Sequence, residues 1–163
     1  MALVLETRAP SSARRALGFS LVLALAITAL AASASGATGK LSPPVIREKF
    51  TILPCNHETT VGLEGCAEGQ LLATDHRINV EVALLFRVLD GATQRRSFVT
   101  SEDLWFKYRD ADCQSVASIY GGGTLAPVEF ADCEVLDNES RSVDLHGHYE
   151  LVEQGSSSPP AWP

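Results

Sequence analysis

The stretch that decides the fold spans residues 71–89 and reads LLATDHRINVEVALLFRVL. Its apolar residues recur at spacings of 7, 4, 3 and 4: Leu71, Ile78, Val82, Leu85 and Leu89. This periodicity is one stripe of an amphipathic helix, and polar residues occupy the positions between. We predict that the helix begins near Leu63 and ends at Asp90-Gly91, where the glycine provides the left-handed conformation that ends many helices.

A second helix is predicted from about Thr93 to Ser118, because apolar and aromatic residues recur along one side of this segment. Thr100 and Asp103 also fit a capping box, which would start the helix later, near Ser101. The longer helix is our prediction.

Gly121, Gly122 and Gly123 break the chain, and Pro127 suits the first turn of a third helix, which Gly147 weakens near its end. Residues 155–163 contain three serines and three prolines and have little to bury, so we expect a disordered tail over residues 152–163. The fold class is therefore all-α: a small disulfide-linked bundle of about three helices.

The N-terminal segment has a different composition from the rest of the chain. Basic residues precede an apolar run that ends in the small residues Ala32-Ser33-Ala34, the order of a cleavable signal peptide over residues 1–37. A permanent membrane anchor is the alternative, but it needs about 20 apolar residues and this run is shorter. Residues 38–54 then carry three prolines and read as an extended arm with no visible chemistry. We expect a periplasmic or secreted protein without stable membrane insertion after cleavage.

The chain is acidic, with 13 Lys and Arg against 20 Asp and Glu. Residues 1–37 hold three of these bases and one acid, so the mature chain keeps 10 bases and 19 acids, a net charge of −9. Nucleic acids and anionic membranes select basic faces, so they are excluded as main partners. A basic protein is the expected partner.

All four cysteines lie in the exported part: Cys55, Cys66, Cys113 and Cys133. An even number in an oxidising compartment predicts two disulfides. Three pairings are possible, and the local one, Cys55 to Cys66 and Cys113 to Cys133, fits the helix plan. Neither pair has the spacing of a zinc site, so we predict no metal.

Catalytic motifs are absent from the sequence: there is no G-x-S-x-G, H-E-x-x-H or phosphate-binding glycine loop. Asp144, His146 and His148 could be imagined as a metal cluster, but a spacing of two residues on a helix places the two histidine rings on different faces, so we interpret them as a solvated helix end. The acidic pairs Glu102-Asp103 and Asp110-Asp112 are read as solvated surface charge. We therefore predict a binding module, not an enzyme, and no cofactor.

The residues around the cysteines carry a family resemblance. The segment Trp105-Phe106-Lys107-Tyr108-Arg109-Asp110-Ala111-Asp112-Cys113 resembles the W-x-x-[FY]-R-D-x-x-C signature of the LprI-like lysozyme inhibitor family. Cys66-Ala67, Asp75 and Ile78-Asn79 are similar to that family's upstream pattern. Residues 122–127, GGTLAP, and Arg141 with Asp144-Leu145 are similar to its downstream pattern. The resemblance covers residues 55–151, which we take as the helical domain.

The resemblance implies an exported, disulfide-linked helical domain and, in characterised relatives, inhibition of lysozyme. Val82 and Thr74 depart from the family pattern, where an aromatic residue and an alanine are usual. We interpret Trp105 and Tyr108 as core aromatics and Arg109 with Asp110 as a structural pair.

The binding surface is then expected elsewhere, and the candidate is the glycine-rich connection that a disulfide flanks: Tyr120, Gly121, Gly122, Gly123, Thr124 and Leu125. An ordinary interhelix connection is the other interpretation of this segment.

Three hypotheses about function follow. In the first, the protein occludes the active-site cleft of a c-type lysozyme, a basic enzyme whose cleft holds two catalytic carboxylates, and its negative charge steers the encounter. In the second, a non-inhibitory envelope protein docks a cationic partner or assists cell-wall machinery. In the third, Glu102 or Asp110 serves a wall-active hydrolase.

Overall fold

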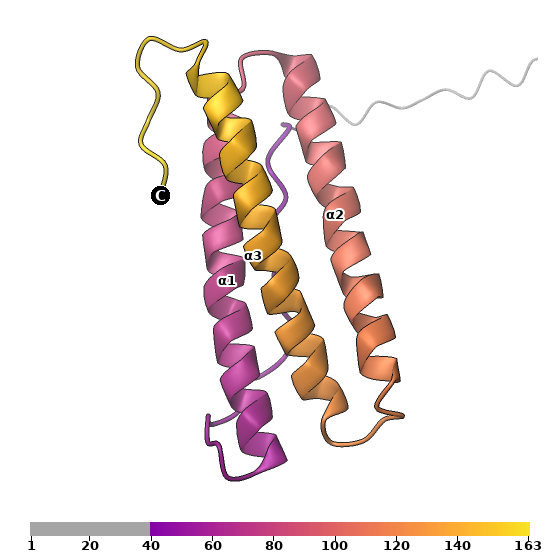
Figure 1. Cartoon of the computed structure of the whole chain (residues 1–163). Helices are drawn as coiled ribbons and strands as arrows, with labels where there is room; N and C mark the ends of the chain where they lie inside the picture. The colour runs from indigo at the N-terminus through magenta and orange to yellow at the C-terminus, as the bar shows by residue number, and fades with distance from the viewer. Residues whose placement is uncertain (1–39) are drawn as a thin grey trace, which may run out of the picture. The chain divides into compact units, whose positions relative to one another are not determined.

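The computed structural model describes residues 40–163, and the predicted signal peptide lies outside them. This part of the chain contains three helices and no strand: α1 over Thr60–Val88, α2 over Ala92–Ser118 and α3 over Ala126–Glu153, with α2 antiparallel to the other two (Figure 1). The all-α prediction is confirmed. The helices are long for so short a chain, so the described unit is an elongated bundle.

The helix boundaries follow local capping chemistry. Thr59 caps α1, and its side-chain oxygen accepts a hydrogen bond from the Gly62 amide at 3.0 Å, so the helix starts before the predicted Leu63. The prediction that Gly91 ends this helix in a left-handed conformation is wrong. Gly91 has φ −101° and caps the start of α2, where the Gln94 side chain accepts from its amide at 2.8 Å. This cap supports the longer second helix.

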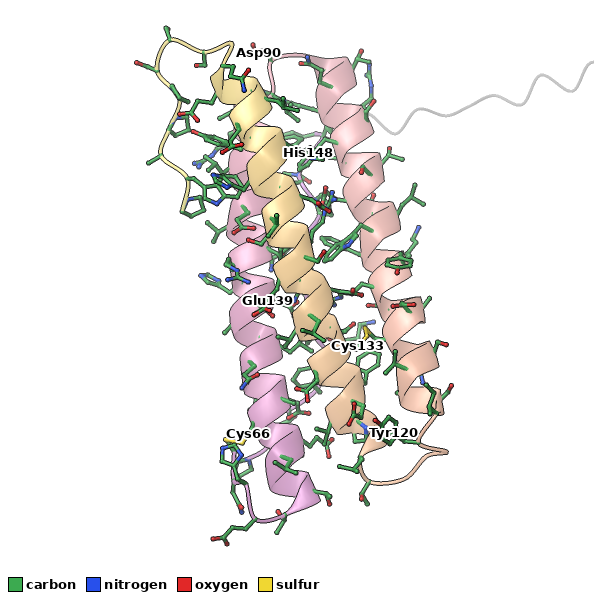
Figure 2. The ribbon with its side chains drawn as sticks, in the orientation of Figure 1. Cys66, Asp90, Tyr120, Cys133, Glu139 and His148 are labelled. Carbon is green, nitrogen blue, oxygen red and sulfur yellow. A yellow bond between two sulfur atoms is a disulfide. The ribbon has the colours of Figure 1, made fainter. Side chains whose placement is uncertain are left out.

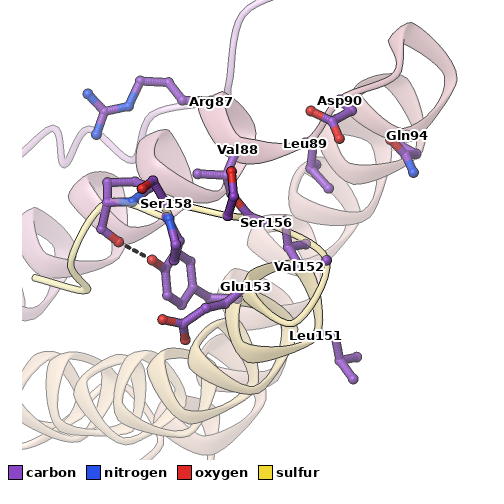
Figure 3. A pocket seen from close by; sticks show the side chains of 15 residues that line it. Arg87, Val88, Leu89, Asp90, Gln94, Leu151, Val152, Glu153, Ser156 and Ser158 are labelled. Carbon is purple, nitrogen blue, oxygen red and sulfur yellow. Dashed lines mark hydrogen bonds between the residues drawn. The ribbon is translucent and has the colours of Figure 1, made fainter.

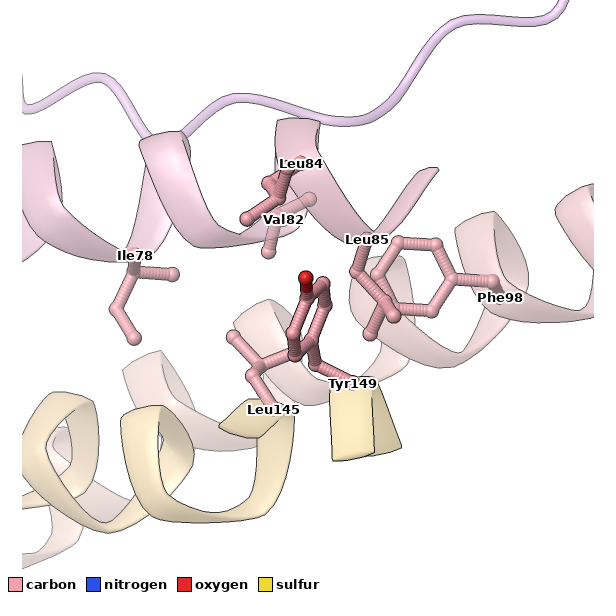
Figure 4. Packing of buried hydrophobic residues seen from close by; sticks show 7 residues of the cluster. All are labelled: Ile78, Val82, Leu84, Leu85, Phe98, Leu145 and Tyr149. Atoms are coloured by element: carbon pink, nitrogen blue, oxygen red, sulfur yellow. The ribbon is translucent and has the colours of Figure 1, made fainter. Parts of the chain in front are cut away.

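The largest hydrophobic cluster lies between α1 and α3 at the end where α1 finishes (Figure 4). Phe98 of α2 joins it from the side, and the cluster comprises Ile78, Val82, Leu84, Leu85, Phe98, Leu145 and Tyr149. A smaller cluster near the other end contains Ala67, Leu71, Val128 and Ala131. Helix α1 packs mainly on α3 and hardly touches α2. Another segment must therefore cover the facing sides of α1 and α2.

That segment is the N-terminal arm, which runs along α1 in the opposite direction. The amide of Ile46 donates to Asn79 Oδ1 at 2.7 Å, and Asn79 Nδ2 donates back to the Ile46 carbonyl at 3.1 Å. Farther along, the Leu53 amide donates to Glu68 Oε2 at 3.0 Å. The described part of the arm, residues 40–54, forms no helix or strand, its polar groups are engaged, and its side chains pack on the two hydrophobic clusters.

Two glycines of α1 permit this close approach. A methyl group at Gly62 would overlap the Asn56 carbonyl, and one at Gly65 would overlap the Leu53 carbonyl. Any larger residue would therefore push the arm off the helix. The arm can therefore lie against α1 only because both positions are glycine.

Both predicted local disulfides are present. Cys55 is bonded to Cys66 and ties the arm to α1, while Cys113 is bonded to Cys133 and ties α2 to α3. The described residues contain no free cysteine. Each bond stabilises the fold mainly by restricting the unfolded chain.

Helix α3 runs to Glu153, two residues into the segment 152–163 that we expected to be disordered, and the tail beyond it contains one side chain that packs. Trp162 lies against the main hydrophobic cluster, with its ring centroid 5.1 Å from those of Tyr149 and His146. The Tyr149 hydroxyl donates to the Pro160 carbonyl. Between the tail and the ends of α1 and α3 is a cavity of about 690 Å³ (Figure 3). The expectation that this segment has almost nothing to bury is corrected by Trp162.

Candidate partner-binding site

The predicted binding residues form the connection between α2 and α3, at the end of the bundle where α1 begins (Figures 1 and 2). All six residues from Tyr120 to Leu125 are exposed. Gly121 and Gly122 have φ of +60° and +75°, a region that residues with a side chain rarely adopt. The sequence therefore needs glycine at both positions to make this turn.

Consecutive backbone hydrogen bonds hold the connection. The Gly121 amide donates to the Ser118 carbonyl at 3.1 Å, the Gly123 amide to the Tyr120 carbonyl at 2.9 Å and the Ala126 amide to the Gly123 carbonyl at 3.0 Å. The Cys113–Cys133 bond joins the flanking helices behind it. The connection is thus a preformed loop, which loses little conformational entropy when it binds a partner.

The surroundings of this loop are acidic. From Asp110 to Ser140 the chain has no Lys or Arg, whereas it carries Asp110, Asp112, Glu129, Asp132, Glu134, Asp137 and Glu139. A hydrogen bond to Glu129 raises the pKa of Tyr120. Desolvation, with the nearby charge of Glu129, raises the pKa of Asp132. We call the loop from Tyr120 to Leu125 together with Glu129 and Asp132 the tip surface.

The family-like residue Arg109 lies in the interior, not at the tip surface. Its side chain is 3% exposed, and it contacts Asp75 at 2.6 Å, Glu48 at 2.9 Å and Glu134 at 3.2 Å. Asn138 accepts a hydrogen bond from Arg109 at 3.0 Å and donates to Asp75 at 2.8 Å. One cation therefore joins the arm and all three helices.

A second buried ion pair lies near the Arg109 cluster, next to the Trp105 ring. Arg141 of α3 pairs with Glu102 of α2, which has no solvent exposure. The Trp105 ring lies between the two guanidinium groups, with its centroid 5.9 Å from Arg109 and 5.6 Å from Arg141. Such cation–π contacts add to the ion pairs, so Trp105 has the structural role we expected.

Other sequence-based interpretations are corrected. Tyr108 is 57% exposed and is not a core residue, because it lies at the edge of the inward-facing side of α2. Asp110 is 69% exposed and lies 3.7 Å from Arg109, so it is a peripheral partner only. The interpretation of Glu102 as solvated charge is wrong, because its side chain is buried against Arg141.

Glu48, Glu134 and Asn138 belong to the same buried network, and sequence reasoning missed them. Burial raises the pKa of Glu134 to about 8, because the attraction of Arg109 only partly offsets desolvation and the charge of Glu48. Arg109 thus supplies one positive charge to three neighbouring carboxyl groups, and its attraction does not keep the pKa of Glu134 in the ordinary range.

Two residue groups have the composition of metal sites. These are Cys55, His57 and Cys66, and Cys113, Cys133 and Asp137. In each group the two sulfurs are joined in a disulfide, which removes the thiolates that a metal would need.

Of the residues Asp144, His146 and His148, His146 has contacts of its own. The rings of His146 and Trp162 are in contact, and His146 Nε2 lies 4.0 Å from Glu150 Oε1. His146 is therefore engaged with the tail and with its own helix, as a helix-end residue is expected to be.

Comparison with protein families gives one match, to the family described as lysozyme inhibitor LprI, over residues 55–145. This protein belongs to the LprI family. The match includes both disulfides and the residues Trp105, Arg109 and Arg141. No curated protein and no solved structure matches the chain significantly.

Membership makes this an LprI-type lysozyme-inhibitor protein, in a family that is typically non-enzymatic. Within the W-x-x-[FY]-R-D-x-x-C segment, Arg109 and Cys113 are buried, whereas Tyr108 and Asp110 are exposed. Within residues 40–163, no helix is long and apolar enough to span a membrane. Glu48, which completes the Arg109 cluster, lies outside the matched region.

Proposed function

We propose that the protein is an exported inhibitor of c-type lysozyme and that its tip surface occludes the active-site cleft. The observation that carries the proposal is the tip surface itself: a preformed loop with exposed Tyr120 and Leu125, on a segment that has no base and carries six acids besides the buried Glu134. Family membership supports the target class. Two disulfides support an oxidising compartment, periplasmic or extracellular.

Charge and shape have separate roles in this proposal. The acidic segment attracts a basic enzyme and raises the association rate in a salt-dependent way. The aromatic ring of Tyr120 and the side chain of Leu125 supply the apolar contact that holds the complex, since buried aromatic residues dominate most interfaces. Inhibition is then stoichiometric, and nothing is turned over.

The test is a titration of the protein lacking residues 1–37 into a lysozyme activity assay at low and high salt. We expect stoichiometric inhibition that weakens as salt increases, because screening reduces the steering. Unchanged lysozyme activity at a large excess of the protein and low salt would refute the proposal. Recovery of a different basic protein from envelope extract, with no effect on lysozyme, would favour the docking hypothesis instead.

A matched pair of variants tests the surface. Tyr120→Arg adds a positive charge at the tip surface and should weaken inhibition at least tenfold, or about 1.4 kcal/mol. Val143→Arg is the control, because Val143 is 72% exposed on α3 and lies outside the tip surface. If both variants inhibit like the unchanged protein, the tip surface is not the binding site.

A further inference from the structure

Helix α2 has an outward side that no other described element covers. It forms one edge of the bundle (Figure 1), and it hardly touches α1. Leu104, Tyr108 and Ile119 on this side are 60%, 57% and 80% exposed. Small and hydroxyl residues occupy the remaining positions of the same side, including Ser97, Ser101, Ala111 and Ser115. We call this line the α2 stripe, and its members are Thr93, Ser97, Ser101, Leu104, Tyr108, Ala111, Ser115 and Ile119.

The composition of the α2 stripe is unusual for a solvated helix face. None of its members is charged, although the chain is strongly acidic. Serine and threonine are weaker helix formers than the Glu and Lys that ordinarily cover such a face. Leu104 and Tyr108 add a large exposed apolar centre. A face that a partner covers explains this composition, whereas a solvated face does not.

The spacing of the stripe fits a second copy of the same helix as the partner. Its members follow one another at intervals of 4, 4, 3, 4, 3, 4 and 4 residues, a sequence that reads the same in both directions. An antiparallel second copy therefore meets the stripe in register over its whole length. We propose that α2 mediates an antiparallel homodimer of this protein.

In this register the paired side chains are compatible. Leu104 of each copy faces Tyr108 of the other at the centre, and Ser101 faces Ala111. Small residues beside the central pair allow the helices to approach closely. The symmetry is that of an isologous interface, in which each contact occurs twice.

The flank of the stripe carries complementary charges. Asp103 and Lys107 are exposed, and the ion pairs among residues 40–163 include neither of them. In the antiparallel register Lys107 lies opposite position 105 of the second copy, within one helical turn of its Asp103. Two such pairs form, one on each side of the symmetry axis.

The size of the stripe sets the strength of the dimer. A helix of 27 residues is about 40 Å long, and a strip about 10 Å wide buries about 400 Å² per copy. Stable interfaces bury roughly 800 Å² per partner. The dimer is therefore weak and reversible, and it forms at high local concentration.

Sedimentation velocity of the protein without residues 1–37, up to about 1 mM, tests the association. We expect a monomer–dimer equilibrium that Leu104→Glu weakens at least tenfold. Val143→Glu is the control, because it places the same charge at an exposed apolar residue of α3. A protein that stays monomeric throughout, or equal weakening by both variants, would overturn the proposal. Loss of lysozyme inhibition in Leu104→Glu without any dimer in the unchanged protein would also overturn it, and would assign the stripe to lysozyme.

A distance measurement tests the register. A spin label on a cysteine introduced at Gln114, an exposed position on the flank, should lie about 24 Å along the axis from its copy in an antiparallel pair. A parallel pair would bring the labels to roughly the 10 Å that separates packed helices. The short distance would refute the antiparallel arrangement.

Discussion

The buried carboxyl group of Glu134 should make the stability of the protein depend on pH. Its side chain is 1% exposed and faces Arg109, Glu48 and Asp110. Burial raises its pKa from 4.5 to about 8. Glu134→Gln keeps the shape and neutrality of the protonated acid but removes the titration.

The sign follows from proton counting. Between pH 4.5 and about 8 the folded protein holds a proton on Glu134 that the unfolded chain releases. The free energy of unfolding therefore falls as pH rises through this window, by up to about 1.4 kcal/mol per pH unit. Over the whole window the loss is at most about 5 kcal/mol. The contribution is complete below pH 4.5 and absent above about 8.

Urea unfolding at about pH 5 and about pH 9 measures this effect. The variant should match the unchanged protein at the lower pH and exceed its stability at the higher one. Glu139→Gln, an exposed position on the same helix, is the control and should retain the full pH dependence. Burial also raises the pKa of Glu48 and Glu102, so the Glu134 variant keeps a smaller slope of the same sign. An equally steep slope in Glu134→Gln would refute the reasoning.

Three further predictions concern stability. Gly65→Ala should destabilise the protein, because its methyl group overlaps the arm backbone. Gly69→Ala meets nothing within 4 Å and should stabilise α1 by about 0.5–1 kcal/mol. Chemical denaturation of the two variants compares these effects. Glu102→Gln removes the buried carboxylate that pairs with Arg141 and leaves it only the exposed Asp144 at 3.7 Å, so a loss of about 3–5 kcal/mol is expected in the same assay. Trp162→Ala should lower the melting temperature, and no change would show that the tail does not contribute to the folded state.

The sequence predicts the helices and their order well because apolar periodicity and capping residues are local signals. The arm and the disulfide pairing are also predictable, since the cysteines flank the predicted helix ends. The buried network is not, because periodicity analysis counts apolar positions and treats Glu102 and Arg109 as solvent-facing. The spacing of Glu102 and Arg109 nevertheless indicates their burial. They recur with Phe98, Trp105 and Cys113 at helical intervals, on the face of α2 that points inward.

Tyr108 shows the opposite error. An aromatic residue three positions from Trp105 looks like part of the same core stripe, yet a helix rotates about 100° per residue. Three positions place Tyr108 at the edge of the stripe, and the position of the arm decides which edge is covered. That choice depends on tertiary contacts of Glu48 and Ile46, which no local pattern encodes.

The course of the arm determines where other molecules can be attached. The described part of the arm begins at Lys40, which lies next to residues near the end of α1. The C-terminal tail returns along the same half of the bundle (Figure 1). Both ends of the described chain are thus remote from the tip surface: Trp162 packs at His146, about 30 Å along α3 from its start at Ala126. A tag, a surface linkage or a fused carrier at either terminus leaves the acidic loop facing outward. The length of the bundle therefore separates the acidic loop from both ends of the described residues.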